Sequence, residues 1–578
     1  MSTTQFIGKG ASSEPSWPSA LLFACLAATA VVAPMLVRGN ISGHDFRFHV
    51  QSWMDVAGQW RKGVLFPHWA EWANWGFGEP RFIFYPPLSW LIGAAIGSVL
   101  PWKMAPGVFV WIALTVAAMS MWCFTREWVP GPYARLSGAL YALNPYHLVI
   151  VYYRSAFGEL LAAAILPLMI WVALRIINGE SRRLPILVIS FAGLWLSNAP
   201  AAVISTYSLG IILLVGCVLR RSLRPVVSGL SGMAGGFALA CFYILPAAWE
   251  QRWVQIRQVV ADAYRPSVNF LFTRVNDPDF VAFNWKVSWV AVGLIVVTAI
   301  AVVCTMKHRE RISRPWWTLA VLGLVATAFM LPPSGWLWRV LPKLWFVQFP
   351  WRWLDVIGVA FAFFAAAAIA DLRRPGTRWV IAVALFAAIG AAGAQMLRQA
   401  PWDSGDLAQI AAWIRDGRGY EGTDEYAPVG CDRYELPGNP DDSQRPAEVS
   451  PNPAPRIAKL ELDSRNVVPA SDVRWHIDAW TSTLKLFTAD TRQPVSLALR
   501  QLPYPGWNIE VDGQSVRPDW MPKTSQILVP IWKGSHRIQL RFGQTWDRTL
   551  GAAISLIAAT TLGGLAWGYR RRALTDGL

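Results

Sequence analysis

Long apolar runs separated by short polar segments dominate the chain. The runs at 20–37, 287–306 and 550–567 each approach the roughly 20 residues that a helix needs to cross a membrane. The same pattern predicts further helices near 106–124, 136–152, 158–176, 184–198, 200–219, 226–246, 315–331, 354–371 and 378–396. The sequence therefore predicts an all-α polytopic membrane protein.

One apolar stretch, at 82–100, is shorter than the others. Its apolar part lies between Pro86-Pro87 and Pro101, which favours a helix that does not cross fully. With this stretch counted either way, the pattern predicts about 12 to 13 transmembrane helices. We interpret the run at 20–37 as a retained first helix, because it is long for a signal peptide and no persuasive polar segment precedes it.

Short basic clusters set the expected orientation, because Lys and Arg are enriched in cytoplasmic loops. The clusters lie at 182–183, 220–224, 307–314, 373–378 and 570–572. With these inside, the first outer loop (38–87), the region of Arg154 and Glu159, and the segment 398–547 fall on the extracytoplasmic side. These clusters also explain the net charge of +16, so no nucleic-acid partner is expected.

Composition agrees with the pattern. Hydrophobic residues make up 54% of the 578 residues and charged residues only 15%, which is too apolar for a soluble protein of this length. Five of the six cysteines lie in apolar runs, and only Cys431 lies in a polar segment. No disulfide framework or metal-binding cysteine pair is therefore expected.

The segment 398–547 has a different character. It is rich in Asp, Pro and Gly at first and then alternates between polar and apolar residues, with turn signals at Asp512-Gly513 and Lys533-Gly534. We expect three parts: a transmembrane domain over 1–397, a small extracytoplasmic β-rich domain over 398–547, and a last helix with a basic cytoplasmic tail over 548–578. The β-rich part carries no catalytic constellation, so packing or acceptor contact is its expected role.

Candidate chemistry begins in the first outer loop, at Gly43-His44-Asp45. A carboxylate near the membrane surface is costly unless it is paired or used, so Asp45 is a candidate functional residue. His44, Asp45 and His49 also have side chains that bind divalent metals, but their spacing is not diagnostic and no metal site is assigned. The many tryptophans of this loop also fit an interfacial aromatic belt.

Two further clusters carry charge beside aromatic residues. Arg154 and Glu159 open an apolar helix, where a carboxylate at a helix start and a snorkelling arginine are the ordinary alternative. A third outer segment contains Arg339, Lys343 and Arg352. Arginine beside aromatic residues there can hold the phosphate of a lipid substrate, and contact with lipid headgroups without catalysis is the ordinary alternative.

Several motifs together resemble a known family. They are Gly43-His44-Asp45 with His49, Phe84-Tyr85-Pro86-Pro87-Leu88, Asn144-Pro145-Tyr146, Tyr153-Arg154 with Glu159, Leu245-Pro246-Ala247 and Gln348-Phe349-Pro350-Trp351-Arg352. The pattern resembles the bacterial 6-pyruvoyl-tetrahydropterin synthase-related membrane proteins, which are similar to YfhO-type members of the GT-C glycosyltransferase superfamily. No pterin-synthase domain or zinc triad is found, so pterin chemistry is not expected.

The resemblance implies a GT-C-like enzyme of the bacterial inner membrane that works in cell-envelope polysaccharide synthesis. Such an enzyme moves a sugar, with inversion, from a polyprenyl-phosphate donor to an extracytoplasmic glycan, lipid or protein acceptor. Asp45 is then the general base. The other residues implied are His44 and Glu159 for catalysis, and Arg47, His49, Tyr85, Arg154, Lys343, Gln348, Trp351 and Arg352 for substrate binding. No cofactor is assigned, and a role for Mg²⁺ or Mn²⁺ is left open.

Two other functions fit the same outer charged cavity. A transporter or flippase of lipid-linked glycan intermediates would show internal repeats and broken helices, and no convincing repeat is found in the sequence. A non-catalytic assembly protein of envelope polysaccharide synthesis would use the β-rich domain to bind a partner. We keep both as alternatives.

Overall fold

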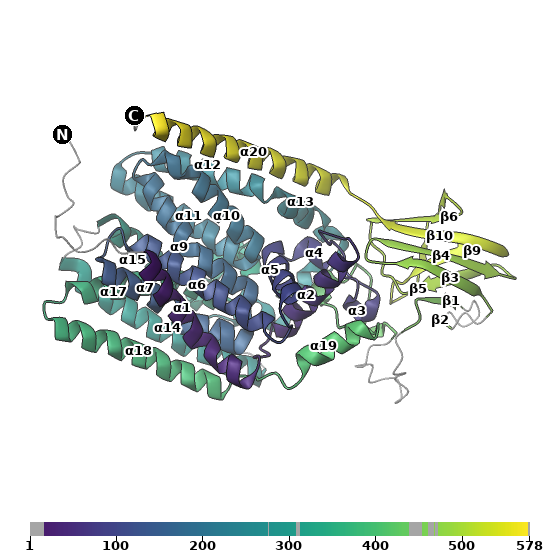
Figure 1. Ribbon diagram of the computed structural model, residues 1–578, viewed down its shortest axis with the longest axis horizontal. Helices are drawn as coiled ribbons and strands as arrows, with labels where there is room; N and C mark the ends of the chain where they lie inside the picture. The colour runs from purple at the N-terminus through teal and green to yellow at the C-terminus, as the bar shows by residue number, and fades with distance from the viewer. Residues whose placement is uncertain are drawn as a thin grey trace.

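The computed structural model describes residues 17–274, 277–307, 313–437, 454–460, 467–468 and 472–575. It consists of a helical body with a β-sheet domain at one end, and the last helix returns along the body (Figure 1). Part of the predicted basic cluster at 307–314 lies outside the described residues.

Eight helices among the described residues are long and apolar enough to cross a membrane. They are α1 (Trp17–Arg38), α6 (Ala105–Thr125), α9 (Phe157–Ile177), α11 (Ala199–Arg220), α14 (Pro278–Thr305), α17 (Leu354–Asp371), α18 (Pro375–Arg398) and α20 (Trp546–Thr575). The prediction of a polytopic helical membrane protein is confirmed.

Two further helix pairs qualify only when each bent pair is taken as one span. α12 (Arg224–Leu239) meets α13 (Cys241–Glu250) at 74°, and α15 (Ser313–Phe329) meets the segment of α16 (Gly335–Val340) at 89°. The described residues then contain up to ten spans. The larger count of 12 to 13 stays a prediction.

Shorter helices fill the places where the apolar pattern was ambiguous. α4 (Arg81–Phe84) and α5 (Pro87–Val99) occupy the stretch at 82–100, and α5 has only 13 residues. The predicted helix at 136–152 is instead broken into α7 (Gly131–Ala142), α8 (Pro145–Val149) and the π-helical turn η1 (Ile150–Arg154). Pro145 lacks a backbone N–H, and Asn144 caps α8 by accepting from Tyr146 N at 3.0 Å. α10 (Leu184–Ser197) follows α9.

The centre of the bundle is formed by α9 and α17. Their apolar parts are 83% and 89% buried, compared with 6% for α20. α17 packs against α7, α14 and α15, while α9 packs against α6, α10 and α11. Polar side chains at the ends of these two helices are therefore enclosed by protein and must find partners there.

Short elements cover the end of the bundle that faces the β-sheet domain. Residues 38–87, the predicted first outer loop, contain α2 (Phe46–Arg61) and α3 (Ala73–Gly76), and α2 packs against α5. Short helical turns connect the later spans, and they are η3 (Gln251–Trp253), η4 (Ile256–Val260), η5 (Asp262–Tyr264), η6 (Pro266–Val268), η8 (Pro332–Ser334), η9 (Leu344–Val347) and η10 (Pro350–Trp353).

The C-terminal β domain is confirmed, and it contains two five-stranded antiparallel sheets. The first sheet has the order β2 (Val467–Val468), β1 (Ile457–Leu460), β5 (Val495–Leu499), β9 (Ile527–Ile531) and β8 (Asp519–Trp520). The second sheet has the order β3 (Arg474–Trp480), β4 (Leu484–Thr491), β10 (Gly534–Phe542), β6 (Trp507–Val511) and β7 (Gln514–Ser515). Alternate residues of β4 are buried, as a sheet with one covered face requires. The predicted turn at Asp512-Gly513 forms a hairpin between β6 and β7, with φ of 53° and 79°. Lys533-Gly534 is not a hairpin turn, because it joins β9 in one sheet to β10 in the other.

Among the described residues the strands begin at Ile457, so residues 398–437 of the predicted β-rich segment are not part of a sheet. Residues 398–437 instead contain α19 (Asp406–Arg415), η11 (Asp424–Tyr426) and η12 (Arg433–Glu435). We call residues 418–436 the strap, because they run between the helical body and the β domain.

A buried ion pair joins the start of α20 to the end of α13. Arg548 Nε and Nη2 donate to the two carboxylate oxygens of Glu250 at 2.7 and 2.8 Å, and the Tyr504 hydroxyl donates to the same carboxylate at 2.5 Å. Glu250 is fully buried. The three side chains therefore connect the bundle, the last helix and the β domain.

Replacing Arg548 by Met should destabilise the protein by about 3–5 kcal/mol, because Glu250 would remain buried without its cation. Thermal unfolding of the purified protein in detergent measures this effect. The control is Arg541→Met, which removes an exposed arginine from β10. Equal unfolding temperatures for the two variants would contradict the importance of the buried pair.

Candidate functional site

The candidate site begins where the chain passes from α1 to α2. Gly43 N donates to Ser155 Oγ at 3.1 Å, and Asp45 N donates to Arg154 O at 2.8 Å. A Cβ atom at Gly43 would lie 2.6 Å from the Tyr153 carbonyl oxygen, so only glycine fits this approach. The contact brings Asp45 beside Arg154, which is distant in the sequence.

Asp45, Arg154, Glu159 and Arg352 form one chain of ion pairs. Arg154 Nη2 lies 3.3 Å from Asp45 Oδ2, and Arg154 Nη1 lies 2.5 Å from Glu159 Oε2. Arg352 Nε lies 3.1 Å from the same Glu159 oxygen, and the Tyr146 hydroxyl donates to the other one. The structure therefore brings together residues that the sequence presented as three separate clusters.

Burial differs sharply along this chain of charges. The side chain of Glu159 is 1% exposed and that of Arg154 is 4% exposed, whereas Asp45 is 40% exposed. A buried carboxylate is tolerated only when cations and hydrogen bonds replace its hydration, and Glu159 has two arginines and a phenol. Asp45 is the only acid of this chain of charges with a carboxylate that reaches solvent.

Arg352 is held in place by the turn before it. Its Nη1 donates to Val347 O at 2.7 Å and to Gln348 Oε1 at 3.0 Å. Gln348 has an unusual backbone conformation, with φ of 67°, and its own Nε2 donates to Val259 O at 2.6 Å. These bonds connect the arginine to η4.

Aromatic rings lie against both guanidinium groups. Trp351 is 5.0 Å from the Arg154 guanidinium and Phe349 is 4.9 Å from that of Arg352, at cation–π distances. The two rings stack on each other at 4.8 Å. The cations are thus fixed between an acid and an aromatic face.

His44, His49 and Tyr85 surround Asp45 on other sides. The His44 ring packs edge-on against Phe283 at 4.8 Å, and burial lowers the pKa of His44. His49 is buried, with Nε2 3.5 Å from the Tyr85 hydroxyl, and burial lowers the pKa of His49 to about 4. His49 is therefore uncharged at neutral pH.

Two predicted binding residues lie away from this group. Arg47 is half exposed and forms an ion pair with Asp406 in α19. Lys343 is exposed, with its ammonium 5.1 Å from the Phe346 ring. Among the described residues, no group of three or more His, Cys, Asp or Glu side chains is arranged to hold a metal ion.

Several polar residues near the site were not predicted. Tyr146 contacts Glu159 directly, and Asp355, in the first turn of α17, is buried with Oδ1 lacking a partner in the described part of the chain. Both ring nitrogens of the buried His147 also lack a hydrogen-bond partner there. Asp355 follows Arg352 by one helical turn, and this spacing is the only sequence signal for it.

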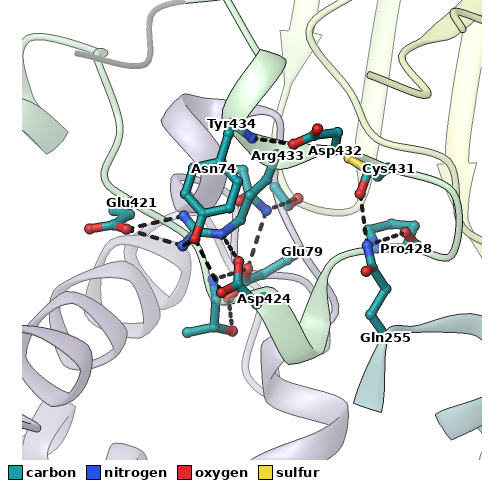
Figure 2. Close-up of polar contacts among 12 residues, drawn as sticks. Asn74, Glu79, Gln255, Glu421, Asp424, Pro428, Cys431, Asp432, Arg433 and Tyr434 are labelled. Carbon is teal, nitrogen blue, oxygen red and sulfur yellow. Dashed lines mark hydrogen bonds and ion pairs between the residues drawn. The ribbon is translucent and has the colours of Figure 1, made fainter. Parts of the chain in front are cut away.

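The strap contacts two separate parts of the helical body. Thr423 N donates to Glu79 Oε2 at 3.0 Å, and Gln255 Nε2 donates to Cys431 O at 2.7 Å. Figure 2 shows Arg433 between Glu421 and Asp424, and its ion pairs with these two acids hold the two ends of the strap together. The strap therefore bridges the first outer loop and the η3–η4 segment.

Glu425 lies in the strap without a cation partner among the described residues. Burial raises its pKa to about 7, and the nearby Glu79 carboxylate adds to this while Arg81 opposes it. The Glu425 carboxylate interacts electrostatically with the Tyr264 hydroxyl, and Tyr264 interacts in the same way with Asp45. Glu425 is thus a second titratable carboxylate on the same side of the bundle.

Glu425 should make stability depend on pH. Its native pKa of about 7 lies above the value of 4.5 for a free glutamate, so its contribution is present below pH 4.5 and is lost as pH rises through 7. At pH 8, the Glu425→Gln variant should be more stable than the native protein by about 1–3 kcal/mol and should unfold at a higher temperature. At pH 4, the two proteins should unfold at the same temperature. The exposed Glu435→Gln is the control, and an unchanged pH profile in Glu425→Gln would refute the expectation.

The fold and site define a multi-pass helical membrane protein with a buried arginine–carboxylate network and a C-terminal β-sheet domain. The family model of the 6-pyruvoyl-tetrahydropterin synthase related domain, a membrane protein family, matches residues 82–397. This range is more than half of the chain, so the protein belongs to this family, and the predicted family is confirmed. The matched range contains Arg154, Glu159 and Arg352, whereas Asp45 precedes it. No curated protein matches the chain.

Proposed function

We propose that the protein is a GT-C-type glycosyltransferase that takes a sugar from a polyprenyl-phosphate donor, with Asp45 as its general base. One observation carries the proposal: the Asp45 carboxylate is 40% exposed yet fixed by Arg154, which is itself anchored on buried Glu159. Such a carboxylate is both oriented and open to a substrate. We further propose that it faces the extracytoplasmic side of a bacterial inner membrane, as the basic clusters predict.

The proposed reaction is a direct displacement with inversion. An acceptor hydroxyl gives its proton to the Asp45 carboxylate while its oxygen forms a bond to the anomeric carbon of the sugar. The bond from that carbon to the donor phosphate oxygen breaks, and the electron pair leaves with polyprenyl phosphate. Asp45 later returns its proton to solvent through its exposed side.

Arg352 is suited to meet the negative charge that develops on the leaving phosphate. Its Nε and Nη1 are used by Glu159, Val347 and Gln348, while Nη2 has no partner within the described part of the chain. A donor of this kind stabilises a developing anion without reorganising. Phe349 beside it is partly exposed and offers apolar surface for a prenyl chain, whereas Trp351 is buried behind it.

Replacing Asp45 by Asn should lower kcat by about 100-fold or more, because the amide cannot accept the proton. The assay uses the purified full chain with polyprenyl-phosphate sugars and a panel of acceptors. Asp416→Asn is the matched control, since Asp416 is 45% exposed and also paired with an arginine, but is not a member of the network. Equal turnover in the Asp45 and Asp416 variants would remove Asp45 as the base.

The bent helix pairs favour a second candidate, a flippase of lipid-linked glycans, because broken helices are typical of transporters. The two candidates differ in a sealed vesicle. A flippase moves labelled lipid-linked sugar between leaflets without breaking the sugar–phosphate bond, and an enzyme releases polyprenyl phosphate.

A further inference from the structure

A groove separate from the Asp45 network lies between the η3–η4 segment and η9. It has a volume of about 510 Å³. Its lining residues are Gln251, Arg252, Val254, Gln255, Ile256, Arg257, Gln258 and Phe346. We call it the Arg252–Arg257 groove.

The groove is positively charged. Arg252 and Arg257 both line it and are exposed, and none of the described lining residues is acidic. Neither arginine forms an ion pair within the described part of the chain. An anion entering the groove therefore meets two guanidinium groups whose charge is not neutralised.

Aromatic rings orient Arg252. Its guanidinium lies 3.8 Å from the ring centroid of Trp249 and 5.1 Å from that of Trp253. Rings on the face of a guanidinium leave its N–H edges free for an anion, and a phosphate oxygen suits those edges. Gln258 and Gln251 add neutral polar groups to the same wall.

The position of the groove fits the edge of a membrane. It begins at the end of the bent α12–α13 span, and Trp249 packs edge-on against Trp546, at the start of α20, with 4.7 Å between ring centroids. Tryptophans at the ends of two spans mark the depth of lipid headgroups. The volume is also in the range of small-molecule sites, about 300–1,000 Å³.

We infer that the Arg252–Arg257 groove binds the phosphate headgroup of an anionic membrane lipid. This inference does not rest on the proposed glycosyl transfer. Phe346 lines the groove, and the next two residues, Val347 and Gln348, hold Arg352. A bound headgroup would therefore brace the turn that positions this arginine.

The test compares the full chain in nanodiscs of phosphatidylcholine alone and of phosphatidylcholine with phosphatidylglycerol. For the native protein, phosphatidylglycerol should raise Tm by about 2–4 °C. Arg252→Gln/Arg257→Gln should lose this gain. Arg537→Gln/Arg541→Gln removes the same charge from exposed positions of β10 and should keep it.

Two further measurements separate loss of lipid binding from loss of folding. Arg252→Lys/Arg257→Lys retains both charges and should retain most of the gain, which separates binding from misfolding. Phosphatidylglycerol that co-purifies with each variant, measured by mass spectrometry, should fall severalfold only in the glutamine variant. The inference is overturned if that variant keeps the full gain and lipid content, or if inorganic phosphate raises Tm equally in phosphatidylcholine nanodiscs.

Discussion

The rest of the structure depends on how the buried charge of Glu159 is compensated. A carboxylate enclosed by apolar helices costs several kcal/mol unless cations replace its hydration. Its two arginines come from segments far apart in the chain, the π-helical turn before α9 and the 3-10 turn before α17. Satisfying one charge therefore fixes the relative position of the two most buried helices of the bundle.

The same compensation sets the character of the candidate site. Arg154 pairs with Glu159 through Nη1 and with Asp45 through Nη2. The buried Glu159 therefore fixes the arginine that orients the exposed Asp45. Preorganised charge of this kind does not have to rearrange when a substrate arrives. Stability and the proposed chemistry consequently share residues, and a change at Glu159 affects both.

Apolar runs were sufficient to predict the helical body, and alternation with turn signals was sufficient to predict the β domain. The apolar run at 136–152 predicts one helix, but Pro145 cannot donate a backbone hydrogen bond, and the chain breaks at Asn144-Pro145. Asp45, Arg154, Glu159 and Arg352 were each singled out, but only tertiary packing decides that they meet. Asp355 and Glu425 were missed because one lies in an apolar helix and the other in a polar loop, where single acids carry no local signal.

The β domain is attached to the bundle on both sides, through the strap and through α20. Direct contacts add to these two connections, because Arg500 Nε donates to Trp75 O at 2.8 Å and Leu502 N donates to Phe77 O at 3.0 Å. The Arg548–Glu250 pair lies at the last residue of α13, at the opposite end of this helix from its bend with α12. The sheet domain is thus fastened to the first loop, to the strap and to α13 at once, so it cannot tilt against the bundle without breaking buried hydrogen bonds.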